Sequence, residues 1–287
     1  MSKVTIPSLL LMKQAGDNIA MVTAYDFPTG RIAEDAGADV VLVGDSLGNV
    51  VLGYSTTLPV TMQDMLLHSK AVRRAIDRPL LVVDMPFMSF NVSTSETIRN
   101  AGRLVKEGGA EAVKIEGAGP RCDTVKALVD AQISVMGHLG LTPQSIHQFG
   151  ELKAQARTAE QAETLLDAAV SLQQAGVFSI VLEAVPRELA SAVTEELSVP
   201  TIGIGAGPDC DGQVLVFHDL CGLNEPNVKK PKHVREYVDG RSVLLKAVRS
   251  YVEEVRSGKF PTDQHSFHLK QNQREAFLEW MARREGE

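Results

Sequence analysis

Eight short apolar runs, each rich in Val, Ile and Leu, recur along the chain with longer amphipathic segments between them. They lie at residues 19–24, 40–44, 80–84, 112–116, 134–138, 179–183, 201–204 and 214–218. Nearly continuous apolar runs are typical of parallel strands that are buried on both faces. Small residues around a glycine precede several runs, as expected where a helix ends and the chain turns into a strand. This pattern predicts one closed (β/α)₈ TIM barrel, with a doubly wound open sheet as the alternative.

The length of 287 residues suits one barrel of roughly 250 residues with an extension. Two features depart from an ideal barrel. Only eight residues, 205–212, separate the last two runs, too few for a crossover helix, and residues 46–59 form a long loop of the kind that often carries function. Beyond the barrel, residues 232–257 are predicted to form the last helix. We therefore expect a catalytic domain over residues 1–268 and a C-terminal helical extension over residues 269–287.

Charge and composition exclude several kinds of partner. The chain has 29 Lys and Arg against 36 Asp and Glu, a net charge of −7, and the positive residues are scattered. This is a poor match for nucleic acid or for anionic membranes. No uncharged apolar stretch approaches the ~18 residues of a membrane span, and the amino-terminal segment does not resemble a signal peptide. Three cysteines without a CxxC pair indicate a reducing compartment, so we expect a soluble cytoplasmic protein that binds small molecules.

Ionisable residues gather at the carboxyl ends of the predicted strands, where the active sites of such barrels lie. The second to sixth strands end respectively in Asp45 with Ser46, Asp84, Lys114 with Glu116, His138 and Glu183. Side chains two residues apart share one face of a strand, so we expect Asp45 on the face of Val41 and Val43. By the same spacing Lys114 and Glu116 point the same way. These side chains are therefore predicted to converge at one mouth of the barrel.

Asp45, Asp84 and Glu116 are the candidate metal ligands. Three carboxylates in one enclosed mouth repel one another unless a cation lies among them. Carboxylate oxygens suit Mg²⁺ or Mn²⁺, with water or substrate completing the coordination. With a divalent ion and Lys114, the local charge sums to zero. The alternative is that these acids cap helices or lie in solvated loops.

Two further residues are candidates for direct roles. Glu183 follows the apolar residues 180–182, where desolvation raises the pKa of a carboxyl group and suits a general base. His138 is predicted to contact the substrate, the alternative being a hydrogen-bonded core histidine. The glycine-rich run at residues 203–207 is followed by Pro208 and by no βαβ helix, so a dinucleotide-binding site is rejected.

Seven motifs carry a resemblance to a known family. They are VGDSLG at 43–48, LPVT at 58–61, DMPFM at 84–88, VKIEG at 113–117, GHLGLTPQS at 137–145, LEAVP at 182–186 and GIGAG at 203–207. In this order they resemble the ketopantoate hydroxymethyltransferase family, over roughly residues 19–268. Ala184 stands where some members carry Cys.

The resemblance implies a barrel of the phosphoenolpyruvate mutase and isocitrate lyase type, dependent on Mg²⁺ and usually assembled as a homodecamer. It implies transfer of a hydroxymethyl group from 5,10-methylenetetrahydrofolate to 3-methyl-2-oxobutanoate in pantothenate and CoA synthesis, through an enolate that Mg²⁺ stabilises. By position, Asp45, Asp84 and Glu116 correspond to the metal site, Asp45, Ser46, Asp84 and Lys114 to the contacts with the 2-oxo acid, and Glu183 to the proton acceptor. Another lyase or mutase of 2-oxo acids, or a barrel that binds without catalysing, are the alternatives.

Overall fold

The computed structural model describes residues 2–149, 154–225 and 230–285. Eight parallel strands form a closed barrel in chain order. They are β1 Ile19–Thr23, β2 Val40–Val43, β3 Leu80–Asp84, β4 Ala112–Glu116, β5 Val135–Gly140, β6 Ser179–Glu183, β7 Thr201–Ile204 and β8 Gly212–Leu215. The barrel closes between β8 and β1, where Met21 pairs with Val214. The predicted TIM barrel is confirmed, and the open-sheet alternative is wrong.

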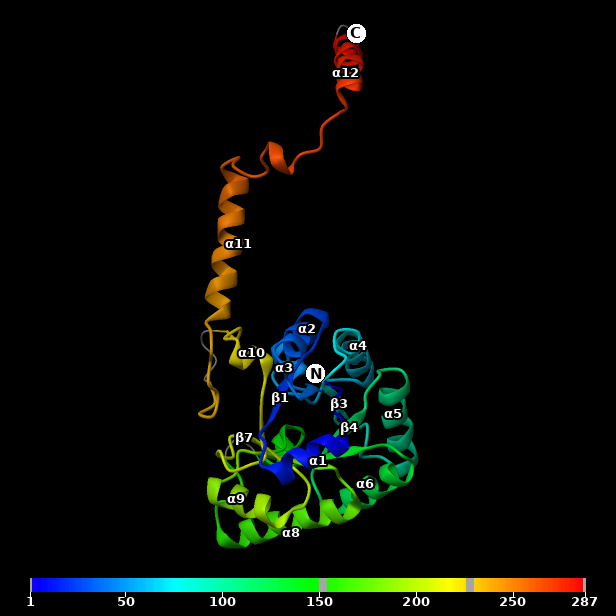
Figure 1. The fold of residues 1–287 in the computed structure, drawn as a ribbon, viewed down its shortest axis with the longest axis vertical. Coiled ribbons are helices and arrows are strands. Elements are labelled where there is room, and N and C mark those ends of the chain that lie inside the picture. Colours follow the sequence, from blue (N-terminus) through cyan, green and yellow to red (C-terminus); the bar gives the residue numbers. More distant parts are fainter. Residues whose placement is uncertain (1, 150–153, 226–229, 286–287) are drawn as a thin grey trace. The chain divides into compact units, whose positions relative to one another are not determined.

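Helices surround the strands of the barrel (Figure 1). The outer helices are α2 Phe27–Asp35, α4 Met62–Arg73, α5 Thr94–Lys106, α6 Pro120–Asp130, α8 Ala159–Ala175 and α9 Arg187–Glu196. Shorter elements lie in the loops, namely α3 Leu47–Val50, the 3₁₀ turn η1 Pro143–Ser145, α7 Ile146–Phe149 and α10 Phe217–Leu220. No helix separates β7 from β8, as the short connection predicts. The long loop after β2 contains α3.

The strand side chains form two separate apolar clusters, one on each face of the barrel wall. Val41 and Val43 belong to the outer cluster, which also contains helix residues such as Leu104. Val40 and Leu42 belong to the inner cluster together with residues of the other strands. Burial on both faces explains why the strands are continuous apolar runs rather than alternating ones.

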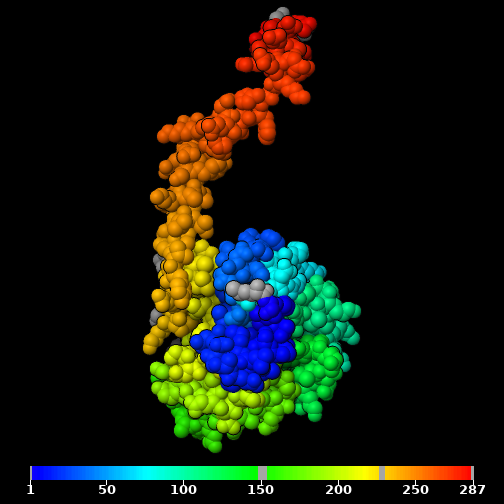
Figure 2. All heavy atoms as spheres, in the orientation of Figure 1, coloured from blue at the N-terminus to red at the C-terminus, as the bar shows by residue number. Residues whose placement is uncertain are grey.

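Helix α1, Ile6–Ala15, covers the amino-terminal end of the barrel. Its Leu9 is 1% exposed and packs in the inner cluster with Val4. The backbone N–H of Val4 donates to the carbonyl of Arg78, just before β3, at 2.8 Å. Figure 2 shows this dark blue segment over the middle of one face of the barrel. The carboxyl ends of the strands lie at the opposite end, which is left for the site.

Two predicted boundaries are wrong. The eighth strand is Gly212–Leu215 rather than residues 214–218, and residues 217–220 form α10. At Gly212 an added Cβ would lie 2.5 Å from the carbonyl oxygen of Ile19, so the strand starts at a glycine, which gives no apolar signal. The helix predicted to begin at residue 232 is α11 Gly240–Arg256, and it begins eight residues later because Asp239 caps it by accepting from the N–H of Ser242.

The chain packs as two compact units, residues 1–238 and 239–287. The first holds the barrel. The second holds α11, the 3₁₀ turn η2 Asp263–His265, and α12 Gln271–Arg284, which lies within the predicted helical extension. The boundary between the two units lies before α11, at residues 238 and 239. That the catalytic domain extends to residue 268 stays a prediction. Of the described helices, none combines the length and apolar character needed to cross a membrane.

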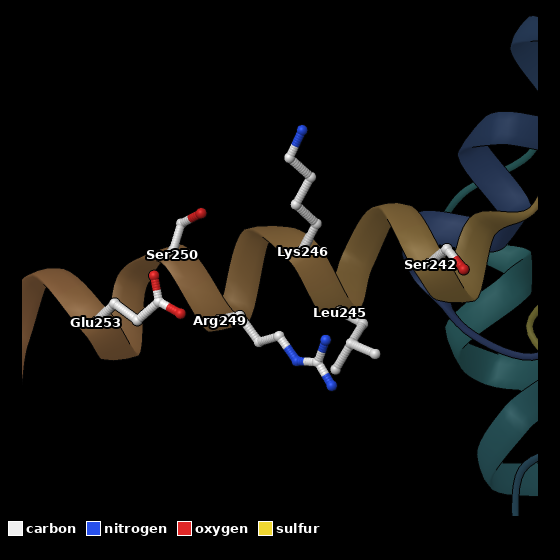
Figure 3. Close-up of a pocket in the computed structure, with 6 residues that line it drawn as sticks. All are labelled: Ser242, Leu245, Lys246, Arg249, Ser250 and Glu253. Atoms are coloured by element: carbon white, nitrogen blue, oxygen red, sulfur yellow. The ribbon is translucent and has the colours of Figure 1, made fainter.

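A shallow hollow of about 310 Å³ lies on α11, within the second unit. Figure 3 shows its lining residues spread along this one helix, with Lys246 and Arg249 pointing to different sides. A single helix with diverging side chains does not enclose a ligand. The hollow is therefore not a candidate active site.

Candidate active site

A cavity of about 620 Å³ lies at the carboxyl ends of the strands. All the predicted site residues line it, namely Asp45, Ser46, Asp84, Lys114, Glu116, His138 and Glu183. Asp45, Asp84, Lys114, Glu116 and His138 are each less than 8% exposed. Charged groups are rarely buried this deeply unless they are paired, which distinguishes this cavity from an ordinary surface cleft.

The register of the barrel places these side chains beside one another. Asp84 on β3 is the direct partner of Lys114 on β4, and Glu116 on β4 is the partner of His138 on β5. Neighbouring strands therefore present their ionisable side chains at matching levels. Asp84 shares its strand with Leu80 and Val82 of the inner cluster, in agreement with its inward position.

Asp45 reaches the cavity by a different route from the one predicted. Val41 and Val43 face the outer helices, so strict alternation would have turned Asp45 away from the barrel interior. The strand ends at Val43, however, and the chain turns at Asp45 and Ser46. The N–H of Asp45 then donates to Asp84 Oδ2 at 3.0 Å, which fixes the turn against β3. Asp45 lines the cavity, as predicted, but it does not share the face of Val41 and Val43.

Glu183 is positioned by a glycine on the neighbouring strand. Gly140 has a φ of +92°, and an added Cβ there would lie 2.2 Å from the carbonyl oxygen of Glu183. The same carbonyl accepts from the N–H of Leu141 at 2.8 Å. Only glycine allows β5 to approach the end of β6 this closely.

A chain of close contacts joins the charged groups. Lys114 Nζ lies 2.9 Å from Asp84 Oδ1 and 3.3 Å from His138 Nδ1. His138 Nδ1 lies 3.5 Å from Glu116 Oε1, and its Nε2 lies 3.2 Å from Glu183 Oε2. His138 therefore connects the carboxylate cluster with the predicted base.

The environment shifts the pKa values of the cluster. Burial, together with the charges of Asp84 and Glu116, raises the pKa of Asp45 to about 8, and Lys114 limits that rise. Burial lowers the pKa of Lys114, but the three carboxylates outweigh this effect and raise it above its ordinary range. Lys114 therefore remains a cation, whereas Asp45 holds a proton near neutral pH in the protein alone.

His138 can hold a proton between two carboxylates. Burial and the charge of Lys114 lower its pKa, but hydrogen bonds to Glu116 and Glu183 outweigh them and raise it to about 9. The Lys114 ammonium can only donate, so its contact with Nδ1 is a hydrogen bond only when the ring is neutral. In the protonated state the two ring nitrogens face Glu116 and Glu183 instead.

Ser46 is held by a buried tyrosine. Its Oγ lies 2.8 Å from the hydroxyl of Tyr25, which is 1% exposed. Burial raises the pKa of Tyr25, so the phenol stays neutral. The neighbouring Asp26 caps α2 by accepting from the N–H of Thr29 at 2.8 Å and takes no part in the cavity lining.

Gln144 in η1 is a site residue that sequence reasoning missed. Its N–H donates to Glu116 Oε2 at 3.0 Å, and its Nε2 donates to Asp45 Oδ2 at 2.9 Å and to the carbonyl of Met85 at 3.0 Å. It lies within the GHLGLTPQS motif, so the only sequence signal was its place just after the fifth strand.

The carboxylates suit a cation that takes part of its coordination from elsewhere. Asp84 Oδ1 is buried and lacks an aligned hydrogen bond, although Lys114 Nζ is close. In the part of the chain that the structure describes, no group of three or more His, Cys, Asp or Glu side chains is arranged to hold a metal ion. Mg²⁺ ordinarily uses one or two protein carboxylates and keeps water or substrate oxygens as its other ligands. The donor set therefore fits Mg²⁺ and does not fit a closed structural zinc site.

Solved structures share this fold at low sequence identity. A phosphonopyruvate hydrolase in complex with oxalate and Mg²⁺ aligns with a TM-score of 0.59 at 13% identity, covering 100% of this chain and 99% of that chain. A 2,3-dimethylmalate lyase of the phosphoenolpyruvate mutase and isocitrate lyase superfamily aligns with a TM-score of 0.57 at 15% identity, covering 93% and 89%. Fold and site together define a (β/α)₈-barrel enzyme with a carboxylate-lined mouth.

The sequence comparisons specify the family. The profile of the ketopantoate hydroxymethyltransferase family matches residues 3–263. The 3-methyl-2-oxobutanoate hydroxymethyltransferase of Pelobacter propionicus is 54% identical over 266 residues, which cover 93% of this chain and 98% of that protein. That of Geobacter sulfurreducens is 53% identical over 263 residues, covering 92% and 98%. The chain belongs to the ketopantoate hydroxymethyltransferase family, so the predicted resemblance is confirmed.

Proposed function

We propose that this enzyme transfers a hydroxymethyl group from 5,10-methylenetetrahydrofolate to 3-methyl-2-oxobutanoate, giving ketopantoate for pantothenate synthesis. The observation that carries the proposal is that Asp84, Lys114 and Glu183 line one cavity. The chain that places them there is 54% identical to a 3-methyl-2-oxobutanoate hydroxymethyltransferase. Enolisation of a 2-oxo acid requires a positive side chain that binds the substrate carboxylate, carboxylates that bind a metal ion, and a base that accepts the proton.

The cavity suits a branched 2-oxo acid. Lys114 offers a positive charge to the substrate carboxylate, and Ser46 lines the same cavity as a hydrogen-bonding group. Leu42, Val181 and Val214 line the same cavity and provide an apolar wall for an isopropyl group. The lining therefore offers polar groups to the substrate carboxylate and an apolar surface to its isopropyl group, as specific small-molecule sites require.

Asp45, Asp84 and Glu116 would hold Mg²⁺, directly or through water, and the ion would supply Lewis-acid polarisation of the substrate ketone. Ionised Asp45 is needed for this, so its proton leaves when the cation binds. Lys114 balances the remaining negative charge of the cluster and stays paired with Asp84.

Glu183 is the proposed acceptor of the C3 proton. Its side chain is 18% exposed, and Oε2 faces His138 Nε2 at 3.2 Å. A carboxylate is a weak base toward a C–H bond, so polarisation of the ketone has to supply most of the activation. The enolate carbon then bonds to the methylene carbon of the folate. Both carbon–nitrogen bonds of the methylene bridge break, water supplies the hydroxyl oxygen, and tetrahydrofolate leaves.

The first test follows the C3 proton of 3-methyl-2-oxobutanoate by NMR in D₂O without folate. We expect the signal to disappear with Mg²⁺ and to persist with EDTA. Exchange that is absent even after tetrahydrofolate is added would contradict the proposal and favour a barrel that binds without catalysing. A panel of other 2-oxo acids, including substrates of carbon–carbon lyases and phosphomutases, separates the related alternatives.

We further propose that the protein is cytoplasmic and assembles as a homodecamer, with small molecules as its substrates and neither nucleic acid nor membrane as a partner. Family membership supports the assembly, and the net charge of −7 supports the exclusion of polyanions. Light scattering coupled to size-exclusion chromatography tests the assembly directly, since a mass other than ten chains would overturn it.

A further inference from the structure

We propose that Gln144 is a positioning residue that holds two of the three cluster carboxylates and thereby sets the affinity of the site for a divalent cation. The inference rests on the proposed function only in assigning a cation to these carboxylates. Gln144 itself does not line the cavity and would not contact substrate. It acts through Asp45 and Glu116.

Gln144 binds one carboxylate through its backbone and the other through its side chain. Its backbone N–H holds Glu116 Oε2, and its side-chain amide holds Asp45 Oδ2. These contacts span 28 and 99 positions of sequence, so one residue of η1 ties β4 and the end of β2 together. One oxygen of each carboxylate is fixed in this way, which restricts the direction of the other.

The orientation of the side-chain amide is determined by its partners. Nε2 donates to the Asp45 carboxyl group and to the Met85 carbonyl, and the Met85 carbonyl has no hydrogen to donate. A reversed amide would place Oε1 against that carbonyl oxygen, so the amide nitrogen must face it. Oε1 then points elsewhere and is buried without a partner among the described residues. A buried unpaired carbonyl is unfavourable, but this orientation lets Nε2 donate both to Asp45 and to the Met85 carbonyl.

A neutral donor suits this position better than a charged one. Lys114 already balances one negative charge through Asp84. A second cation beside Asp45 would compete with the metal, whereas an amide orients the carboxylate without neutralising it. Residues that orient metal ligands in this way typically change metal affinity about 10- to 100-fold when replaced.

The test measures Mn²⁺ affinity by calorimetry, without substrate, for Gln144→Met and Gln144→Asn. Met keeps the volume but has no donor, and Asn keeps the amide but is too short to reach Asp45. Both retain the backbone contact with Glu116. We expect each to bind Mn²⁺ at least about 10-fold more weakly than wild type. The matched control is Gln174→Met, an exposed glutamine on α8, which should bind as wild type does.

Circular dichroism and the melting temperature without metal identify folded variants, and if Gln144→Met does not fold, Gln144→Asn decides. A folded variant with wild-type Mn²⁺ affinity overturns the role of Gln144 and leaves the proposed function intact. A lower melting temperature with unchanged Mn²⁺ affinity assigns Gln144 a merely structural role and also overturns the proposal. A wild-type protein without Mn²⁺ affinity overturns both this inference and the cation of the proposed function.

Discussion

His138 Nε2 lies 3.2 Å from Glu183 Oε2, and the same ring faces Glu116 through its other nitrogen. The proposed base is therefore not an isolated carboxylate but one end of a buried chain of close polar contacts. Since His138 is 2% exposed, it has little freedom to turn, and its position restricts that of Glu183.

Replacing Glu183 with Gln should preserve binding of the 2-oxo acid while slowing C3 exchange by about 100-fold or more, the usual contribution of a general base. Calorimetry measures binding and NMR in D₂O measures exchange. Glu188→Gln, at an exposed position on α9, is the control and should exchange normally. Unchanged exchange in the Glu183 variant would remove this residue from the role of base.

Replacing His138 with Phe should lower kcat by about 10-fold or more and change KM for the 2-oxo acid less, because the ring acts on Glu183 rather than on the substrate carboxylate. His138→Gln, which keeps a donor, should recover part of kcat. Steady-state kinetics measures both constants. If only KM rises, His138 contacts substrate directly, as the sequence predicted.

Replacing Asp84 with Ala should weaken Mg²⁺ and substrate binding together and should also destabilise the fold. The change removes the carboxylate that lies 2.9 Å from Lys114 Nζ, and breaking such a buried ion pair costs about 3–5 kcal/mol. Thermal unfolding and calorimetry give the two effects. The double variant Asp84→Ala/Lys114→Met should recover stability without recovering binding. Normal affinity for both ligands in the single variant would place the site elsewhere.

Cation affinity should increase as the pH rises through about 8. Asp45 titrates near that value in the protein alone, and its proton must leave before the carboxylate can ligate a metal. The pKa of Asp45 is about 8 in the folded protein and 3.8 in the unfolded chain. Between pH 3.8 and about 8 only the folded state holds this proton, so the contribution of Asp45 to stability falls as the pH rises through that range. Calorimetry in two buffers of different ionisation enthalpy detects the released proton. Affinity that is constant from pH 6 to 9 would contradict this assignment.

Replacing Gly140 with Ala should destabilise the protein by about 2–4 kcal/mol, because the new Cβ meets the carbonyl of Glu183 at a positive φ. Chemical unfolding measures the change. Gly102→Ala is the matched control, since Gly102 lies within α5 with open space around it. That change should stabilise the protein by about 0.5–1 kcal/mol. Equal effects at the two positions would mean that the close approach of β5 and β6 is not needed.

The closed barrel could be predicted because its signals are local. A strand buried on both faces needs an uninterrupted apolar run, and seven of the eight runs place their strands to within two residues at each end. The eighth run missed the start of its strand, which begins at Gly212. Glycine is required there by a neighbouring carbonyl that is distant in sequence, and its lack of a side chain leaves nothing for a pattern to detect.

The sequence by itself determined the barrel, the family and the strand ends that carry Asp84, Lys114, Glu116 and Glu183, since strand periodicity and motif order are properties of neighbouring residues. Only the tertiary structure decided how Asp45 enters the cavity and which side chain holds it. A turn redirects Asp45 after β2, and Gln144 reaches it across 99 positions of chain. Such contacts depend on where folding places distant segments, and no local pattern records that.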